Sequence, residues 1–66
     1  MTPTQMGRRL RALRTAKGWS QAALAKRARL TRVYITRLEA GQYDPTLTTL
    51  TALAKALGVP VTTLLA

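Results

Sequence analysis

The sequence predicts an all-α domain of about five short helices, formed by one segment, residues 1–66. Apolar residues make up 47% of the chain, and most are Leu and Ala, which suit helices better than strands. They recur three and four positions apart, and no stretch alternates as a half-buried strand does. Capping residues and glycines divide this pattern into pieces of helical length. The sequence therefore indicates a single compact helix bundle without repeats or linkers.

The first helix is expected to follow a Thr4 cap and to run to about Lys17, with residues 1–3 as a frayed end. Gly18 then ends it, because glycine readily takes the left-handed conformation found after helices. The predicted buried stripe of this helix consists of Met6, Leu10 and Leu13.

The next two helices are short and are joined by a tight turn. One covers residues 21–28 after a Ser20 cap, and the other covers residues 32–40 after a Thr31 cap. Gly41 is expected to end the second of them in a left-handed conformation. The apolar side of the pair consists of Leu24, Ala25, Ala28, Ile35 and Leu38.

A fourth helix is predicted after a Thr46 cap, and Gly58 closes it. Its three threonines are weak helix formers, so packing of the apolar stripe must hold it. Pro60 then sets the start of a last short helix. The predicted stripe consists of Leu47, Leu50, Leu53, Ala54 and Leu57.

Charge points to a polyanionic partner. Eleven Lys and Arg residues against two acids, Glu39 and Asp44, give a formal net charge of +9. Nucleic acid is the first expected partner and an anionic membrane surface the second, and charge alone does not separate them. No apolar run is long enough to span a bilayer, and the N-terminus lacks the apolar core of a signal peptide. A cytoplasmic protein is expected.

Composition also excludes several kinds of site. The chain has no cysteine and no histidine, which rules out disulfides and a Cys/His zinc site. The two carboxylates have no visible partner for acid–base chemistry, so neither an enzyme nor a metal or cofactor is expected. No pattern for a small-molecule ligand is evident.

The helix at 32–40 is expected to present a polar and basic face. At 100° per residue, one arc holds four residues: Arg32, Val33, Thr36 and Arg37. The DNA major groove accepts such a helix, and Arg can bind guanine O6 and N7 there in a bidentate way. A surface helix with solvated arginines explains this helix alone equally well.

Several motifs occur in a fixed order between about Met6 and Leu65: S-Q-x-x-L-A, T-R-x-Y-I-x-x-L-E-x-G, P-T-L-x-x-L, LAKALGV and LL. In this order and spacing the chain closely resembles the phage-repressor (Cro and C1 type) helix-turn-helix family, which includes bacterial Xre-like regulators. The resemblance implies a lambda-repressor-like domain of five helices. It further implies a transcriptional regulator that binds double-stranded DNA, usually as a homodimer, at the nucleoid of a bacterium or a phage host.

The resemblance also assigns roles to residues. The positions expected to contact bases are Arg32, Val33, Thr36 and Arg37. The positions expected to contact the DNA backbone are Gln21, Thr31, Tyr34 and Arg29; for Tyr34 a packed ring is an equal alternative. Two features depart from the family, which usually has glycine where this chain has Arg29 and a basic loop where it has residues 42–44.

Two further contacts are expected between helices or subunits. Glu39 lies at the end of its helix, where the macrodipole disfavours an anion, so it needs a partner. Arg14 is that partner in several relatives, which predicts a partly buried ion pair. The segment after Gly58 carries more apolar residues than one short helix can bury against so small a core. This predicts a dimer interface of Val59, Val61, Leu64 and Leu65.

Two other functions are weighed. A protein-binding module of the same fold, such as an antitoxin or a coactivator-like domain, remains the alternative because fold does not fix function. A basic membrane-active peptide fits less well, because the apolar faces of five separate helices match one another.

Overall fold

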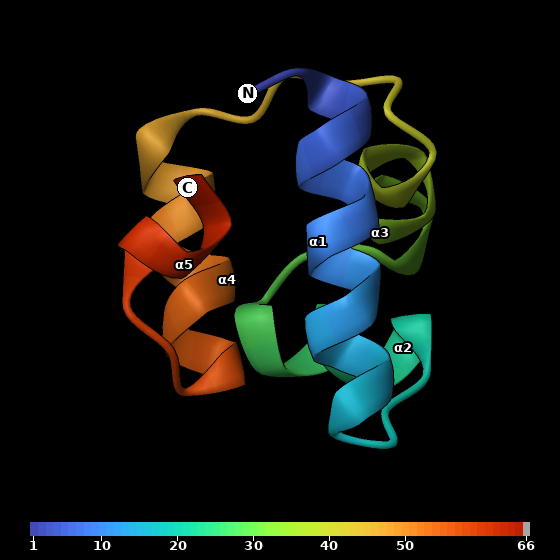
Figure 1. Ribbon diagram of the computed structural model, residues 1–66. Coiled ribbons are helices and arrows are strands. Elements are labelled where there is room, and N and C mark those ends of the chain that lie inside the picture. Colours follow the sequence, from blue (N-terminus) through green and yellow to red (C-terminus); the bar gives the residue numbers. More distant parts are fainter. Residues whose placement is uncertain (66) are drawn as a thin grey trace.

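The computed structural model describes residues 1–65 and contains five helices and no strand in that range (Figure 1). The all-α prediction is therefore confirmed. The helices are α1 (Pro3–Ala16), α2 (Gln21–Ala28), α3 (Arg32–Glu39), α4 (Leu47–Leu57) and α5 (Val61–Leu65). None of them is both long enough and apolar enough to cross a membrane.

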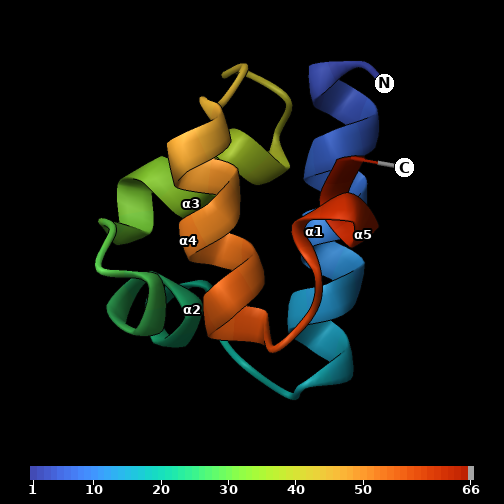
Figure 2. The ribbon, with the colours of Figure 1, turned by 90° about the vertical axis from the view of Figure 1, so that its left-hand side faces the viewer.

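The core forms where the apolar stripes of all five helices meet. In this arrangement α1 packs on α3 and α5, α2 packs on α3 and α4, and α4 packs on α5 (Figure 2). Eight large side chains are fully buried, and burial of this apolar surface is the main force holding so small a domain together. They are Met6, Leu10, Leu24, Ile35, Leu38, Leu53, Leu57 and Leu64.

Three predicted caps are confirmed. The side chains of Ser20, Thr31 and Thr46 each accept a hydrogen bond from the backbone N–H three residues later. At the other helix ends, Gly58 and Arg29 both adopt left-handed backbone conformations, with φ of 70° and 59°. Arg29 therefore takes a left-handed conformation although it carries a side chain.

The predicted start of α1 is wrong. Thr2, not Thr4, is the N-cap, and its hydroxyl accepts a hydrogen bond from Gln5 N at 3.1 Å. The Gln5 side chain in turn accepts from Thr2 N at 2.9 Å, completing a capping box. Pro3 occupies the first helical position, where its fixed φ suits the helix and its missing N–H costs nothing. Thr2 and Pro3 are thus part of the helix start and not of a frayed end.

Two apolar residues are not where the patterns placed them. Leu47 is 63% exposed because it sits in the first turn of α4, before the helix meets the core. Leu64, expected at a dimer interface, is fully buried within the chain's own core. α5 packs on both α1 and α4, which gives this side chain a complete site in one subunit. Leu64 is therefore unavailable to a partner, while Leu65 remains 41% exposed.

Candidate nucleic-acid interface

One face of α3 is buried and the other is open to solvent. Ile35 and Leu38 are fully buried and fix the helix on the core. The four residues expected to contact bases are all exposed: Arg32, Val33, Thr36 and Arg37. Val33 is 53% exposed although it is apolar. The structure thus brings the expected base-reading residues together on one accessible face.

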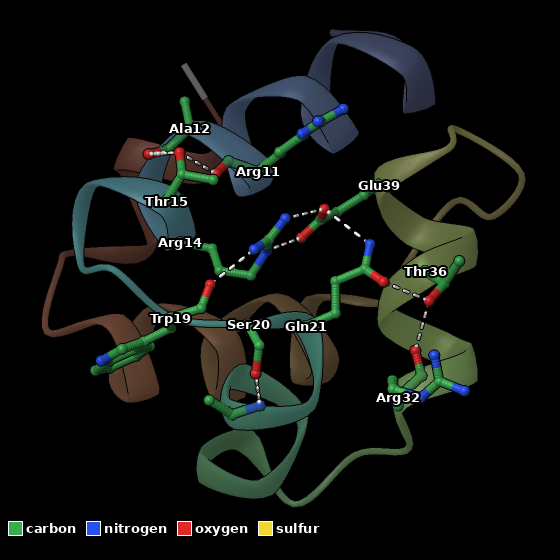
Figure 3. A network of polar contacts seen from close by, with 11 residues as sticks. Arg11, Ala12, Arg14, Thr15, Trp19, Ser20, Gln21, Arg32, Thr36 and Glu39 are labelled. Atoms are coloured by element: carbon green, nitrogen blue, oxygen red, sulfur yellow. Dashed lines mark hydrogen bonds and ion pairs between the residues drawn. The ribbon is translucent and has the colours of Figure 1, made fainter.

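Behind this face, a buried ion pair ties the end of α3 to α1. Arg14 Nε and Nη2 donate to the two carboxylate oxygens of Glu39 at 2.7 and 2.9 Å, and the side chains are only 11% and 4% exposed. The expected bidentate pair is present. Arg14 Nη1 also donates to the Trp19 carbonyl at 2.7 Å, so this guanidinium is held on two sides (Figure 3).

The pair keeps Arg14 charged. Hydrogen bonding to Glu39 raises the pKa of Arg14 above its ordinary value; burial opposes this rise, and the charge of the carboxylate adds to it. Bidentate charge-assisted bonds of this kind are directional as well as strong. The pair therefore fixes how α1 is oriented relative to α3.

Gln21 extends this network from Glu39 to the exposed face. Its Nε2 donates to Glu39 Oε1 at 3.1 Å, and its Oε1 accepts from the Thr36 hydroxyl at 2.7 Å (Figure 3). The same hydroxyl lies 3.0 Å from the Arg32 carbonyl, a second acceptor. The single hydroxyl proton of Thr36 is thus used inside the chain, and its oxygen is left facing outward as an acceptor.

On the other side of α3, two tyrosines adjoin an exposed arginine. The rings of Tyr34 and Tyr43 stack with centroids 5.4 Å apart and planes 25° apart. Arg37 Nη1 donates to the Tyr43 hydroxyl at 3.0 Å. Tyr34 is half-buried against the core, so a packed ring on α3 supports Tyr43, which lies in the loop before α4.

The other residues expected at the DNA backbone lie near the ends of α2 and α3. Thr31 is exposed at the start of α3, and Gln21 lies at the start of α2. Arg29 is exposed in the left-handed turn between the two helices.

Sequence reasoning missed two residues that shape this region. For Tyr43 the sequence indicated only that its loop lacks basic residues. No local pattern predicts its hydrogen bond with Arg37. Gly7 lies where α1 crosses α3, and a Cβ there would collide with the carbonyl oxygens of Leu38 and Glu39. A glycine inside a helical pattern was the available signal for such a close approach.

Comparison with known proteins identifies the family. The helix-turn-helix family matches residues 10–64. The chain belongs to the Cro/C1-type helix-turn-helix family. Members of this family are DNA-binding transcriptional regulators.

Individual relatives agree with this assignment. The immunity repressor protein of Bacillus phage phi105 is 41% identical over 56 residues, which are 85% of this chain and 39% of that protein. This chain thus spans about two fifths of that relative. The restriction-modification controller protein C.AhdI from Aeromonas hydrophila is 42% identical, with a TM-score of 0.92 over 94% of each chain. The DNA-binding domain of the P22 c2 repressor is 37% identical, with a TM-score of 0.89 over 98% of this chain and 86% of that one.

Proposed function

We propose that this chain binds a specific double-stranded DNA operator as a homodimer and regulates transcription, with α3 in the major groove. The observation that carries the proposal is the open face of α3. Two exposed arginines, a threonine and an exposed valine share it, on a chain of net charge +9. A solvated surface helix has no need of an exposed valine, whereas a thymine methyl group offers it an apolar contact.

Each residue on this face offers a different chemistry. Arg32 and Arg37 can bind guanine O6 and N7, and Val33 can contact a thymine methyl. Because Gln21 and the Arg32 carbonyl are the acceptors of the Thr36 hydroxyl within the chain, the Thr36 oxygen keeps a lone pair for a donor on the DNA. It suits the amino group of adenine or cytosine. Because Arg32 and Arg37 are the proposed readers of guanine, we expect at least one guanine in each half-site.

Backbone contacts set the register without choosing bases. The proposed phosphate contacts are Gln21, Thr31, Tyr34 and Arg29, all of them exposed or half-buried. Gln21 keeps a second Nε2 proton for this role after bonding Glu39. Binding should weaken steeply with salt, because each neutralised phosphate releases counterions.

A binding-site selection on random DNA, followed by competition among single-base variants of the selected site, tests this proposal. Arg37→Ala and Arg32→Ala should each lose about 1–3 kcal/mol on the selected site and relax the preference at one base pair. Gln21→Ala should weaken all sequences more evenly. If both arginine variants keep the wild-type ranking of sites, the two side chains contact phosphates and the assignment of readers is wrong.

A homodimer would place two copies of α3 about 34 Å apart, in successive major grooves of an inverted repeat. Support for an interface comes from Leu65, which is 41% exposed and lines a hollow together with residues of α1. Val59 and Val61, which precede it in the chain, are half-buried. Arg8 and Arg9 line the same hollow, and their repulsion across a two-fold axis favours weak association without DNA.

Sedimentation with and without operator-sized DNA tests the dimer. We expect Leu65→Lys to leave binding to an isolated half-site unchanged and to weaken binding to the inverted repeat. A monomer at high protein concentration and on the full operator would contradict the dimer.

A further inference from the structure

Tyr43 lies outside α3, yet its hydroxyl is bound by an arginine of that helix. Arg37 Nη1 donates to it at 3.0 Å, and no other side chain in residues 1–65 accepts from this guanidinium. We propose that Tyr43 is a positioning residue, which holds the Arg37 guanidinium in the orientation that reads guanine. The inference rests on the proposed function and adds to it a determinant of specificity in the loop after α3.

The support for Tyr43 can be followed back to the core. Its ring stacks on Tyr34 at 5.4 Å, and Tyr34 packs against the core from α3 itself. The loop begins with Gly41 at φ 77°, and Gln42 N donates to the Arg37 carbonyl at 3.0 Å. This turn brings the chain back over α3. The Tyr43 hydroxyl is therefore held in place from two directions, by its ring and by its backbone.

The geometry leaves the useful edge of Arg37 free. A guanidinium has five N–H donors in a planar fork, and the edge formed by Nε and Nη2 can bind two acceptors at once. Tyr43 engages only Nη1. Arg14 of the same chain uses its guanidinium in this way. Its Nη1 donates to the Trp19 carbonyl, while its Nε and Nη2 donate to the Glu39 carboxylate. In Arg37 the corresponding edge is open for guanine O6 and N7.

The energetic benefit is preorganisation. A free arginine side chain loses rotamer freedom when it binds, and a bond formed beforehand removes part of that loss. Holding one such side chain corresponds to roughly a 2- to 10-fold gain in affinity. Because the gain passes through Arg37, it should appear only at sites that offer the guanine read by Arg37.

The test is a double-mutant cycle of Tyr43→Phe and Arg37→Ala on the selected operator and on a variant lacking that guanine. Tyr43→Phe keeps the stacked ring and removes only the hydroxyl. We expect about a 2- to 10-fold loss on the operator, no loss on the variant site, and no further loss when Arg37 is already alanine. Tyr34→Phe is the matched control, since it deletes the other hydroxyl of the same stack and should affect all sequences alike.

Two outcomes would overturn the proposal. One is unchanged binding by Tyr43→Phe; the other is a loss that is equal on every sequence and persists with Arg37→Ala, which would make Tyr43 a phosphate contact. If Arg37→Ala itself keeps full discrimination, the proposed reader fails instead. The contact by which Tyr43 holds Arg37 is then tested in the free protein by NMR relaxation of the Arg37 Nε–H group. Tyr43→Phe should increase its mobility, and unchanged mobility would refute this role of Tyr43 independently of DNA.

Discussion

On one side of α3, the Glu39 side chain is 4% exposed and is bound by Arg14 and Gln21; on the other, Arg37 is exposed and is bound by Tyr43. A charge buried in this way is costly when its partner is removed, whereas an exposed contact adds little to stability. The two sides of this eight-residue helix therefore have different roles. The buried side fixes where α3 lies, and the exposed side is left to read a partner.

Gln21 of α2 connects the buried and the exposed side of α3. It touches the buried carboxylate with one end of its amide and the exposed Thr36 hydroxyl with the other. The orientation of a residue on the open face is thus set from the interior of the protein. Substitutions on the buried side are therefore expected to lower the free energy of unfolding most, and to change DNA base preference as a secondary effect.

The largest expected effect comes from breaking the buried pair. Glu39→Gln leaves the Arg14 guanidinium buried without a counter-charge and should lower the free energy of unfolding by roughly 3 kcal/mol or more. Because the pKa of Arg14 is raised in the folded state, its contribution is fully present below the ordinary pKa of arginine and declines only in stronger alkali. Substitution is therefore the practical way to break the pair.

Asp44→Asn is the matched control, because Asp44 is the other acid of the chain and is exposed. It makes the same change in net charge and should alter stability by less than about 0.5 kcal/mol. Denaturant melts of the two variants decide the matter. Similar losses from both would mean that net charge, and not the buried pair, stabilises the domain.

A second way to disturb the buried side is to separate α1 from α3. In Gly7→Ala the new methyl would collide with the backbone carbonyls of Leu38 and Glu39, which cannot move independently of α3. We expect a loss of about 1–3 kcal/mol, despite the better helix propensity of alanine. The exposed position 12 of the same helix supplies the opposite control, since Ala12→Gly should cost about 1 kcal/mol through propensity alone. A stabilised Gly7→Ala protein would show that the helices can shift apart at no cost.

The link between the sides is tested by Gln21→Met, which keeps the length of the side chain and removes both hydrogen bonds. We expect a loss of about 1 kcal/mol in stability. We also expect a relaxed base preference opposite Thr36, whose proton is no longer held by Gln21. Gln42→Met, at an exposed loop position, is the control and should change neither property. Intact base discrimination in Gln21→Met would show that Arg32 alone orients the Thr36 hydroxyl.

The sequence predicted what depends on local chemistry. The caps at Ser20, Thr31 and Thr46 follow from residues three positions apart, and the partner of Glu39 follows from the macrodipole together with the family resemblance. Burial was harder to predict where it depends on distant elements. Helical spacing could not tell that Leu47 precedes the contact of α4 with the core, or that α1 and α4 together enclose Leu64.

The candidate site shows the same division. Its open face could be predicted, because side chains on one arc of a helix point the same way. The contact between Tyr43 and Arg37 could not, because it depends on the path of a loop, and nothing in the residues from 42 to 45 specifies that path. Nor could the contact between Thr36 and Gln21 be predicted, since the two residues are 15 positions apart in the chain.

The smallest expected effect lies at the end of α2, in the turn that leads to α3. Arg29 is the one non-glycine residue with positive φ in residues 1–65, and its side chain is exposed. Arg29→Gly relieves a cost of roughly 1 kcal/mol for a left-handed side chain but adds freedom to the unfolded chain. A net gain of about 0.5 kcal/mol should remain. Arg29→Ala removes the same charge while keeping the Cβ, so it should gain no stability.

DNA affinity tests the role of the charge separately, because both variants should lose the same sequence-independent amount of affinity if Arg29 contacts a phosphate. Equal stability of the glycine and alanine variants would mean that the turn holds its left-handed residue without strain.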